Sequence, residues 1–541
     1  MYMRTHEVLN QPPPLPEIDL FATDPILPSA VAREGAGWAT TQLSEYGNRV
    51  GSAEVAEWGF LANENPPVLK THDRFGHRVD QIEFHPAWHS LMEMSIGAGV
   101  HSLAYEHDEG GHVARAAMSY VDGQVEQGHG CPISMTSSVL ASLRHQHDLA
   151  AEWEPRILSR SYDPRYLPAP EKDGVLMGMG LTEKQGGSDV RANTSVADPA
   201  DDAYRITGHK WFVSAPICDA FLVLAQAPGG LSCFLLPRFA PDGTVNEFRI
   251  QRLKDKLGNR SNASSEVEFE NSWAQLVGEE GRGVRTIVEM INGTRLDCTI
   301  GSAAIMRQAV TNAAHHLTHR SAFGSLLVDK PLMRAVIADL EVETEASTLL
   351  MMRMAGAFDR AEADPDEAAL KRVLTPIAKY WVTKRCTAVV QEALECLGGG
   401  GYVEESIMAR LFRESPLNAI WEGSGNVIAL DLLRALSREP GARDAIFSAI
   451  EPARGADQRL DAAIDALDSA IADLEDPDRE ARRLIEQAAL VIQGALVVQH
   501  GSRQLADVFC ATRLEGDWGH LFGTIPARMA IDELVGAALP A

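Results

Sequence analysis

Cysteine is scarce and scattered in this 541-residue chain, and its scarcity excludes several classes of protein. The seven cysteines form no CxxC pair, which argues against zinc ribbons, thioredoxin-like redox sites and disulfide scaffolds. Long apolar runs are missing too: no stretch of about 18 apolar residues occurs, so we expect no transmembrane helix and no membrane partner. The N-terminal segment lacks the apolar core of a secretory signal. Together these absences predict a cytoplasmic protein with reduced thiols.

Positive charge is also in short supply. Lysine and arginine number 49 against 75 aspartates and glutamates, a formal net charge of −26. Such an excess of negative charge opposes non-specific binding to nucleic acid. Residues 440–541 hold nine arginines and no lysine against seventeen acids. Their one tight basic group is Arg479, Arg482 and Arg483, which we interpret as a solvated helix face.

Common cofactor and metal motifs are missing as well. The chain has no P-loop, no HExxH helix and no GxGxxG between a strand and a helix; Gly178-Met-Gly180 is only a GxG. His315 and His319 lie four residues apart, and His107 and His112 flank two acids. Because further ligands of suitable type are not evident, we interpret both groups as surface or core histidines and predict no metal site.

The pattern of apolar residues predicts several domains in the order helical, β, helical. At about 150 residues per domain, the length suggests three to four. Ala220–Gln226 and Leu231–Leu236 flank a Pro-Gly-Gly turn and predict a hairpin, and Val267 and Phe269 alternate as in a strand. No βαβ alternation occurs, which argues against a Rossmann sheet. We expect an extended lead at 1–36, a helical domain at 37–174, a β domain at 175–280, a helical bundle at 281–440 and a helical extension at 441–541.

Long helices are predicted at about 331–362 and 375–397, the second stopping at the glycine run 398–401. In the extension, apolar residues recur every three or four positions from Leu460 to Leu474. This narrow seam fits a helix packed in a bundle, and the alternative is a short coiled coil that binds a partner.

Three segments carry residue types that suit chemistry. Leu181–Asp189 (LTEKQGGSD) combines hydroxyls with glycines that let a ligand approach the backbone. His319–Gly324 offers a guanidinium fork and an aromatic ring at a helix end. Ile420–Asn426 sets Glu422 between an indole and a glycine, where desolvation would make it a general base. Each segment alone could also be an ordinary turn, helix cap or exposed loop.

Taken in order, these segments resemble the acyl-CoA dehydrogenase family of flavoproteins over about residues 80–435. LTEKQGGSD is similar to the family's LTEPxAGSD loop, and the other matching segments are Lys210–Ser214, Lys256–Ser261, Arg320–Gly324, Leu397–Tyr402 and Trp421–Ser424. The resemblance implies an α+β fold: a helical N-terminal domain, a middle β-barrel domain, a C-terminal four-helix domain and, here, a helical C-terminal extension. It also implies FAD, an acyl-CoA thioester substrate and a homotetramer.

The resemblance further implies roles for individual residues. Glu422 would remove the α-proton of the thioester while the β-hydrogen leaves as hydride to flavin N5, and Arg295 would neutralise charge nearby. Arg320 and Phe323 would contact the adenosine diphosphate part of FAD, across a subunit boundary. The residues implied to line the flavin are Met179, Thr182, Gly187, Ser188, Phe212, Val213, Ser214, Ile420, Trp421, Gly423 and Asn426.

Within the family, the chain resembles an alkylation-response branch. That likeness implies a short or branched acyl-CoA, similar to isovaleryl-CoA, and an association with the response to DNA alkylation. It leaves an alternative open: a protective flavoprotein that binds double-stranded DNA and keeps only vestigial dehydrogenase activity. The acidic composition of residues 440–541 argues against DNA binding. Glu395 stands where some members have glutamine near the flavin pyrophosphate, which implies different local geometry there.

Overall fold

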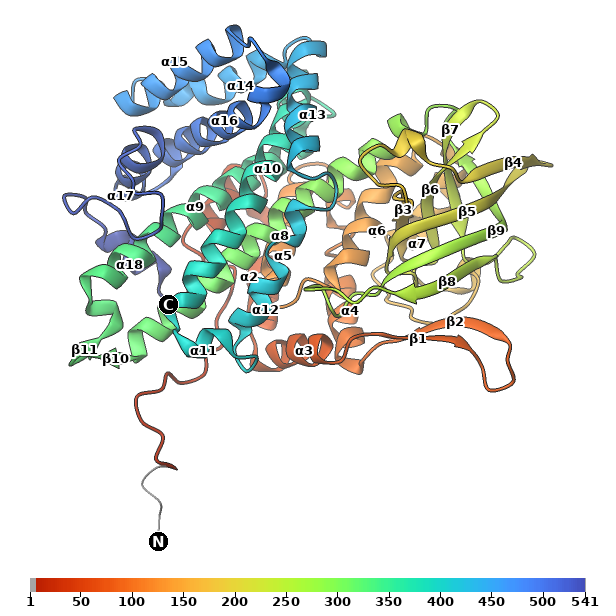
Figure 1. The fold of residues 1–541 in the computed structure, drawn as a ribbon, viewed down its shortest axis with the longest axis horizontal. Coiled ribbons are helices and arrows are strands. Elements are labelled where there is room, and N and C mark those ends of the chain that lie inside the picture. The colour runs from red at the N-terminus through yellow and green to blue at the C-terminus, as the bar shows by residue number, and fades with distance from the viewer. Residues whose placement is uncertain (1–5, 541) are drawn as a thin grey trace. The chain divides into compact units, whose positions relative to one another are not determined.

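The computed structural model describes residues 6–540, so residues 1–5 of the predicted lead and residue 541 of the predicted extension lie outside the described residues. The chain divides into two compact units, Ala53–Asp297 and Met1–Ser52 with Cys298–Ala541. Helix α8 (Gly283–His319) runs through that division. Figure 1 gives the order of the elements along the chain. The ranges of the five predicted domains stay predictions.

Helices dominate the first part of the unit Ala53–Asp297, as predicted. One departure is a β-hairpin that sequence patterning missed, because its strands are largely exposed and carry no apolar stripe. It joins β1 (Val68–His72) to β2 (Arg78–Glu83), which pair antiparallel. The helices are α3 (Ala53–Glu64), α4 (Pro86–Ala98), α5 (Gly111–Gly123), α6 (Gly130–Leu143) and α7 (His147–Ile157).

The second part of this unit is a β-barrel. Its strands are β3 (Met177–Gly180), β4 (Val196–Ala200), β5 (Ala203–Ser214), β6 (Ala220–Ala227), β7 (Gly230–Pro237), β8 (Phe248–Leu253) and β9 (Ser264–Val277). The pairings β6–β7, β7–β9, β9–β5, β5–β4 and β4–β6 close a circuit, and β3 and β8 add to β6 and β9. The predicted hairpin is confirmed as β6–β7, in register from Ala220–Pro237 to Ala227–Gly230. The α+β fold with a middle barrel is therefore confirmed.

The other unit is almost entirely helical. Besides the later part of α8, it contains α1 (Leu27–Arg33), α2 (Thr40–Val50), α9 (Pro331–Arg360), α10 (Pro365–Cys396), α11 (Gly399–Tyr402), α12 (Ile407–Glu414), α13 (Gly425–Arg438), α14 (Ala442–Ile450), α15 (Gln458–Ala472), α16 (Pro477–His500), α17 (Arg503–Phe509) and α18 (Asp532–Ala538). The hairpin β10 (Ser321–Ala322) and β11 (Ser325–Leu326) follows α8. Both predicted long helices are present, as α9 and α10.

Helix α9 lies at the centre of this unit, buried on all sides from Ile337 to Phe358 apart from Arg353. It carries four buried acids, and arginines from other helices pair with three of them, Asp339, Glu341 and Glu343. Arg307 forks onto Glu341 at 2.8 and 2.9 Å, and Arg385 and Arg513 reach Glu343 at 3.0 and 3.4 Å. Because Arg513 lies in the C-terminal extension, that extension is part of the charge balance of the core.

The seam of the C-terminal extension packs within the bundle. Leu460, Ile464 and Leu467 of α15 are fully buried, and α15 packs against α16. This agrees with the bundle-helix interpretation rather than with a free coiled-coil face. Across residues 6–540, no helix has both the length and the apolar character needed to cross a membrane.

Candidate functional site

The motif residues of the barrel gather at one edge, where β3 meets the end of β5. The backbone N–H of Trp211 donates to the carbonyl of Thr182 at 2.8 Å, which joins the loop after β3 to β5. A Cβ on Gly187 would lie only 2.4 Å from the Thr182 hydroxyl, so glycine there lets the loop fold back on Thr182. Met179, Thr182, Gly187 and the segment Phe212–Ser214 are thereby brought together.

These side chains differ in solvent exposure, and therefore in how each could contact a ligand. Phe212 is 51% exposed, whereas Val213 is 1% exposed and faces the barrel core. The ladder between β5 and β9 is irregular between Lys210 and Val213, which turns Phe212 outward. Ser214 and Met179 are half-buried, and Ser188 is exposed. Val213 can therefore contribute to a ligand surface only through its backbone.

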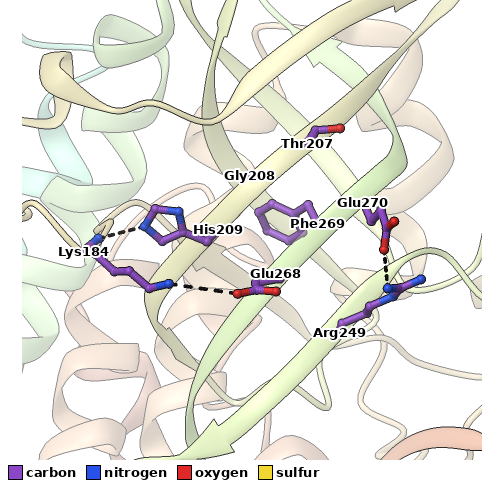
Figure 2. Close-up of a pocket in the computed structure, with 8 residues that line it drawn as sticks. All are labelled: Lys184, Thr207, Gly208, His209, Arg249, Glu268, Phe269 and Glu270. Atoms are coloured by element: carbon purple, nitrogen blue, oxygen red, sulfur yellow. Dashed lines mark hydrogen bonds and ion pairs between the residues drawn. The ribbon is translucent and has the colours of Figure 1, made fainter.

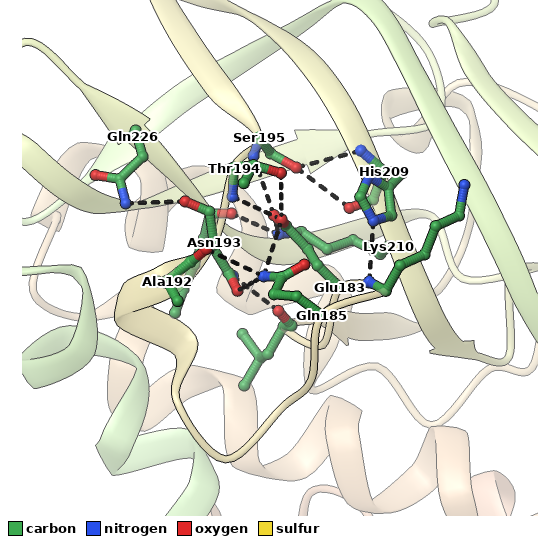
Figure 3. A network of polar contacts seen from close by, with 12 residues as sticks. Glu183, Gln185, Ala192, Asn193, Thr194, Ser195, His209, Lys210 and Gln226 are labelled. Carbon is green, nitrogen blue, oxygen red and sulfur yellow. Dashed lines mark hydrogen bonds and ion pairs between the residues drawn. The ribbon is translucent and has the colours of Figure 1, made fainter.

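A buried ion pair fixes the loop that carries Thr182, Gly187 and Ser188. The Lys210 ammonium donates to Glu183 at 2.8 Å, and both side chains are fully buried (Figure 3). Glu183 also accepts hydrogen bonds from the backbone N–H groups of Thr194 and Ser195 at 2.6 and 3.1 Å. Burial alone would raise the pKa of Glu183, but Lys210 and these N–H groups lower it to about 2. Both ends of the 183–195 loop are thus tied to one carboxylate.

A hollow of about 290 Å³ lies on the barrel and is lined by eight residues (Figure 2). Its walls carry ion pairs, Lys184 with Glu268 at 4.0 Å and Arg249 with Glu270. The lining residues are Lys184, Thr207, Gly208, His209, Arg249, Glu268, Phe269 and Glu270. None of the predicted site residues is among them, although Lys184 belongs to the motif loop Leu181–Asp189, so the hollow borders that loop without including the predicted flavin-lining residues.

In the other unit, Phe323 stands at the tip of the β10–β11 hairpin and is completely exposed. Both Phe323 and Gly324 have left-handed backbone angles, φ 51° and 83°, as a tight two-residue turn requires. Asn10 holds the base of the hairpin: it exchanges two hydrogen bonds of 2.8 Å with the backbone of Ser321. Its carbonyl accepts from Arg320. Sequence reasoning did not foresee this contact with the N-terminal lead.

The loop Ile420–Asn426 also has an unusual backbone. Glu422 has φ +57° and Gly423 has φ +106°, so two consecutive residues occupy the left-handed region. The indole N–H of Trp421 donates to Asn418 at 2.8 Å, and Asn418 donates to Ser302 at 3.2 Å. Glu422 is half-buried, and Ile420 and Asn426 are exposed. The loop therefore presents a carboxylate from a fixed backbone.

The remaining predicted residues lie as follows. Arg295 is buried on α8, within the unit Ala53–Asp297, and its guanidinium lies 3.4 Å from Asn292. Its implied role beside Glu422 stays a prediction. Glu395 is exposed near the end of α10. The His315 ring bonds to the carbonyl of Pro13 at 2.9 Å. Between residues 6 and 540, no three His, Cys, Asp or Glu are grouped to hold a metal ion.

One buried cluster was not foreseen from the sequence. His129 is fully buried between Asp122 and Glu126, 2.9 Å from each carboxylate. Burial opposes a charge on the ring, but the two carboxylates outweigh it and raise the pKa of His129 to about 10. Glu126 also accepts from Ser261 at 2.7 Å, so the cluster joins α5 and α6 to the motif segment Lys256–Ser261.

The chemistry of these residues fits a flavin nucleotide. Thr182, Ser188 and Ser214 supply hydroxyls, Gly187 leaves backbone accessible, and Phe212 offers an exposed flat ring. Hydroxyl and backbone donors suit the polar edges of an isoalloxazine and a phosphate, while an aromatic face suits its plane.

Comparison with known proteins agrees with this chemistry. Three family models match: the adaptive response protein AidB N-terminal domain at residues 10–164, the acyl-CoA dehydrogenase middle domain at 178–272 and the acyl-CoA dehydrogenase C-terminal domain at 281–437. The chain is 46% identical to the Escherichia coli K12 protein named "Putative acyl-CoA dehydrogenase AidB", over 95% of both chains.

Two solved structures extend the comparison. Caenorhabditis elegans ACDH-11, solved with C11-CoA, has a TM-score of 0.86 at 28% identity and matches 99% of this chain and 97% of its own. A Bacillus anthracis acyl-CoA dehydrogenase solved with FAD shares the fold, with a TM-score of 0.63 at 18% identity over 80% of this chain and 81% of its own.

Proposed function

We propose that this chain, which belongs to the acyl-CoA dehydrogenase family and carries its AidB N-terminal domain, binds FAD and oxidises a short or branched acyl-CoA of the isovaleryl type. The observation that carries the proposal is the loop Ile420–Asn426, which presents Glu422 from a fixed, left-handed backbone. The worm relative solved with C11-CoA supports a thioester ligand.

In this proposal Glu422 is the general base that removes the α-proton of the acyl thioester. A carboxylate suits this task when its surroundings are partly desolvated, because its basicity then rises toward the operating pH. Glu422 is half-buried beside Trp421, so its surroundings are partly desolvated. A buried arginine, Arg295, would balance negative charge that develops nearby.

The barrel edge would hold the isoalloxazine through Thr182, Ser188 and Ser214, with the ring of Phe212 beside it. Arg320 and Phe323 would hold the adenosine diphosphate part. When bound, FAD supplies the two-electron acceptor that receives the β-hydrogen of the substrate. We further propose a homotetramer, in which the fully exposed ring of Phe323 would reach the cofactor of a neighbouring subunit. We place the protein in the cytoplasm.

The test is an anaerobic titration of the FAD-loaded protein with isovaleryl-CoA and straight-chain acyl-CoAs up to eleven carbons, followed by the flavin spectrum. Wild type should bleach with at least one thioester, and Glu422→Gln should bind the same thioester and bleach only at a far slower, residual rate. A wild-type spectrum that no thioester bleaches would reject the dehydrogenase proposal.

The alternative is a DNA-binding protective flavoprotein that takes part in the alkylation response. The C-terminal extension offers it little support, because most of its arginines are already engaged: Arg443, Arg454, Arg459, Arg513 and Arg528 pair with carboxylates, and Arg482 donates to a tyrosine. Counterion release needs cations that are available to phosphates. A gel-shift series with duplex DNA from low to physiological salt separates the two functions, and we expect no shift at physiological salt.

A further inference from the structure

A buried lysine lies behind the loop that presents Glu422. Lys379 of α10 is 1% exposed, and its ammonium donates to the carbonyl of Trp421 at 3.0 Å and to the carbonyl of Gly423. Burying an ammonium is costly unless polar groups surround it. Two backbone carbonyls of one short loop supply polar partners for the ammonium. The burial of Lys379 and the conformation of the loop therefore depend on each other.

The two carbonyls stand on either side of Glu422. The carbonyl of Trp421 belongs to the peptide that precedes Glu422, and that of Gly423 to the second peptide after it. Fixing both leaves the backbone of Glu422 little freedom to rotate. This matters because Glu422 has φ +57°, a conformation that residues with a Cβ rarely adopt and that surrounding contacts must maintain.

The loop has a second anchor at the indole of Trp421, through Asn418. That anchor holds the side chain before Glu422, whereas Lys379 alone among these contacts holds the backbone on both sides. The direction of the bond from Cα to Cβ of Glu422 follows from that backbone. Lys379 thus acts on the carboxylate without belonging to the reacting atoms.

We propose that Lys379 is a positioning residue for the reaction, which aims the carboxylate of Glu422 by holding the carbonyls of Trp421 and Gly423. The inference rests on the proposed function, since it assigns a role relative to the base. It differs from a purely structural role in one respect: removing Lys379 should impair proton abstraction through Glu422 and nothing else in catalysis.

The first test measures the rate of anaerobic flavin reduction by a bleaching thioester in Lys379→Met, Glu422→Gln and the double variant, each loaded with FAD. Misplacing a catalytic group by about 1 Å costs roughly 100-fold in rate, so Lys379→Met should lose about 10- to 100-fold while thioester binding stays within about twofold. In the Glu422→Gln background, Lys379→Met should cause no further loss, because residues that act as a unit are not additive. A full further loss, or an unchanged single-variant rate, would overturn the proposal. Lys371→Met, on the same helix, is the control for loss of a lysine charge.

The second test does not depend on turnover. Hydrogen exchange of the amides from Trp421 to Gly425 should quicken in Lys379→Met and stay as in wild type in Lys371→Met. Unchanged exchange in this loop would refute the role of Lys379 even if the protein oxidises no thioester. Conversely, a wild type that no acyl-CoA bleaches, together with quickened exchange in Lys379→Met, would reject the dehydrogenase proposal and leave the anchoring of the loop established.

Discussion

Replacing Lys210 by methionine tests whether the buried ion pair with Glu183 holds the 183–195 loop. Lys210 and Glu183 are both fully buried, and the ammonium also donates to the carbonyl of Leu224 at 2.7 Å. Methionine keeps most of the side-chain volume, so the change removes the charge and two hydrogen bonds without opening a large cavity.

The size of the effect follows from what remains around Glu183. Breaking a buried ion pair by removing one partner costs about 3–5 kcal/mol, because the other charge is left uncompensated. Glu183 keeps two backbone N–H donors, from Thr194 and Ser195, so we expect the lower end, about 3 kcal/mol. That energy corresponds to roughly a 100-fold rise in the fraction of molecules in which the loop is open.

Hydrogen exchange of the Thr194 and Ser195 amides measures that fraction locally, which suits a chain of several domains that need not unfold in one step. Lys210→Met should lower their protection about 100-fold, and Glu183→Gln added to it should restore part of the loss by removing the stranded charge. Lys184→Met changes an exposed lysine of the same loop and should leave protection unchanged. Protection in Lys210→Met equal to wild type, or a double variant worse than the single, would refute the reasoning.

Two further predictions concern the buried histidine and the exposed phenylalanine. The pKa of His129 is raised to about 10, so its contribution to stability is full below pH 6.5 and is lost as the pH rises through about 10. His129 also lowers the pKa of Glu126 to about 2, so the contribution of Glu126 to stability is lost as the pH falls from 4.5 toward 2. His129→Gln should cost about 3–5 kcal/mol at neutral pH and flatten the alkaline decline in melting temperature, and a decline as steep as in wild type would contradict this. Phe323→Ala should change the free energy of unfolding by less than about 0.5 kcal/mol, since the ring is fully exposed and its neighbour, the Lys330 ammonium, lies 6.0 Å from its centroid, yet lower FAD retention on gel filtration. Unchanged FAD retention would remove Phe323 from the cofactor site.

The sequence could predict elements whose signal is local. The β6–β7 hairpin follows from two apolar runs around Pro228-Gly229-Gly230, and α9 and α10 follow from length and the glycine stop. The β1–β2 hairpin escaped prediction because its strands are mostly exposed and give no apolar alternation. The position of this hairpin depends on backbone pairing between β1 and β2 rather than on the burial of apolar side chains.

The sequence predicted the candidate site through its motif segments. It did not predict the contacts that hold those segments in position. Glu422 lies in a recognisable motif, but nothing in the spacing between Lys379 and that motif indicates that the Lys379 ammonium reaches the backbone carbonyl of Trp421. The bond from Asn10 to Ser321 likewise joins residues more than 300 positions apart. Contacts of this kind depend on the packing of the whole unit, which local sequence patterns do not encode.

The pairing of residues 1–52 with 298–541 has a consequence for how the protein is made. Residues 1–52 are translated before residues 53–297, yet they share a compact unit with residues 298–541, which are translated afterwards. At about 5–20 residues per second, α9 is synthesised on the order of tens of seconds after Phe21 and Leu27. Arg513, which pairs with Asp339 of α9, is synthesised later still. During that interval the apolar segment around Phe21 and Leu27 lacks the partners that bury it, so a chaperone that recognises such segments would bind the nascent chain there.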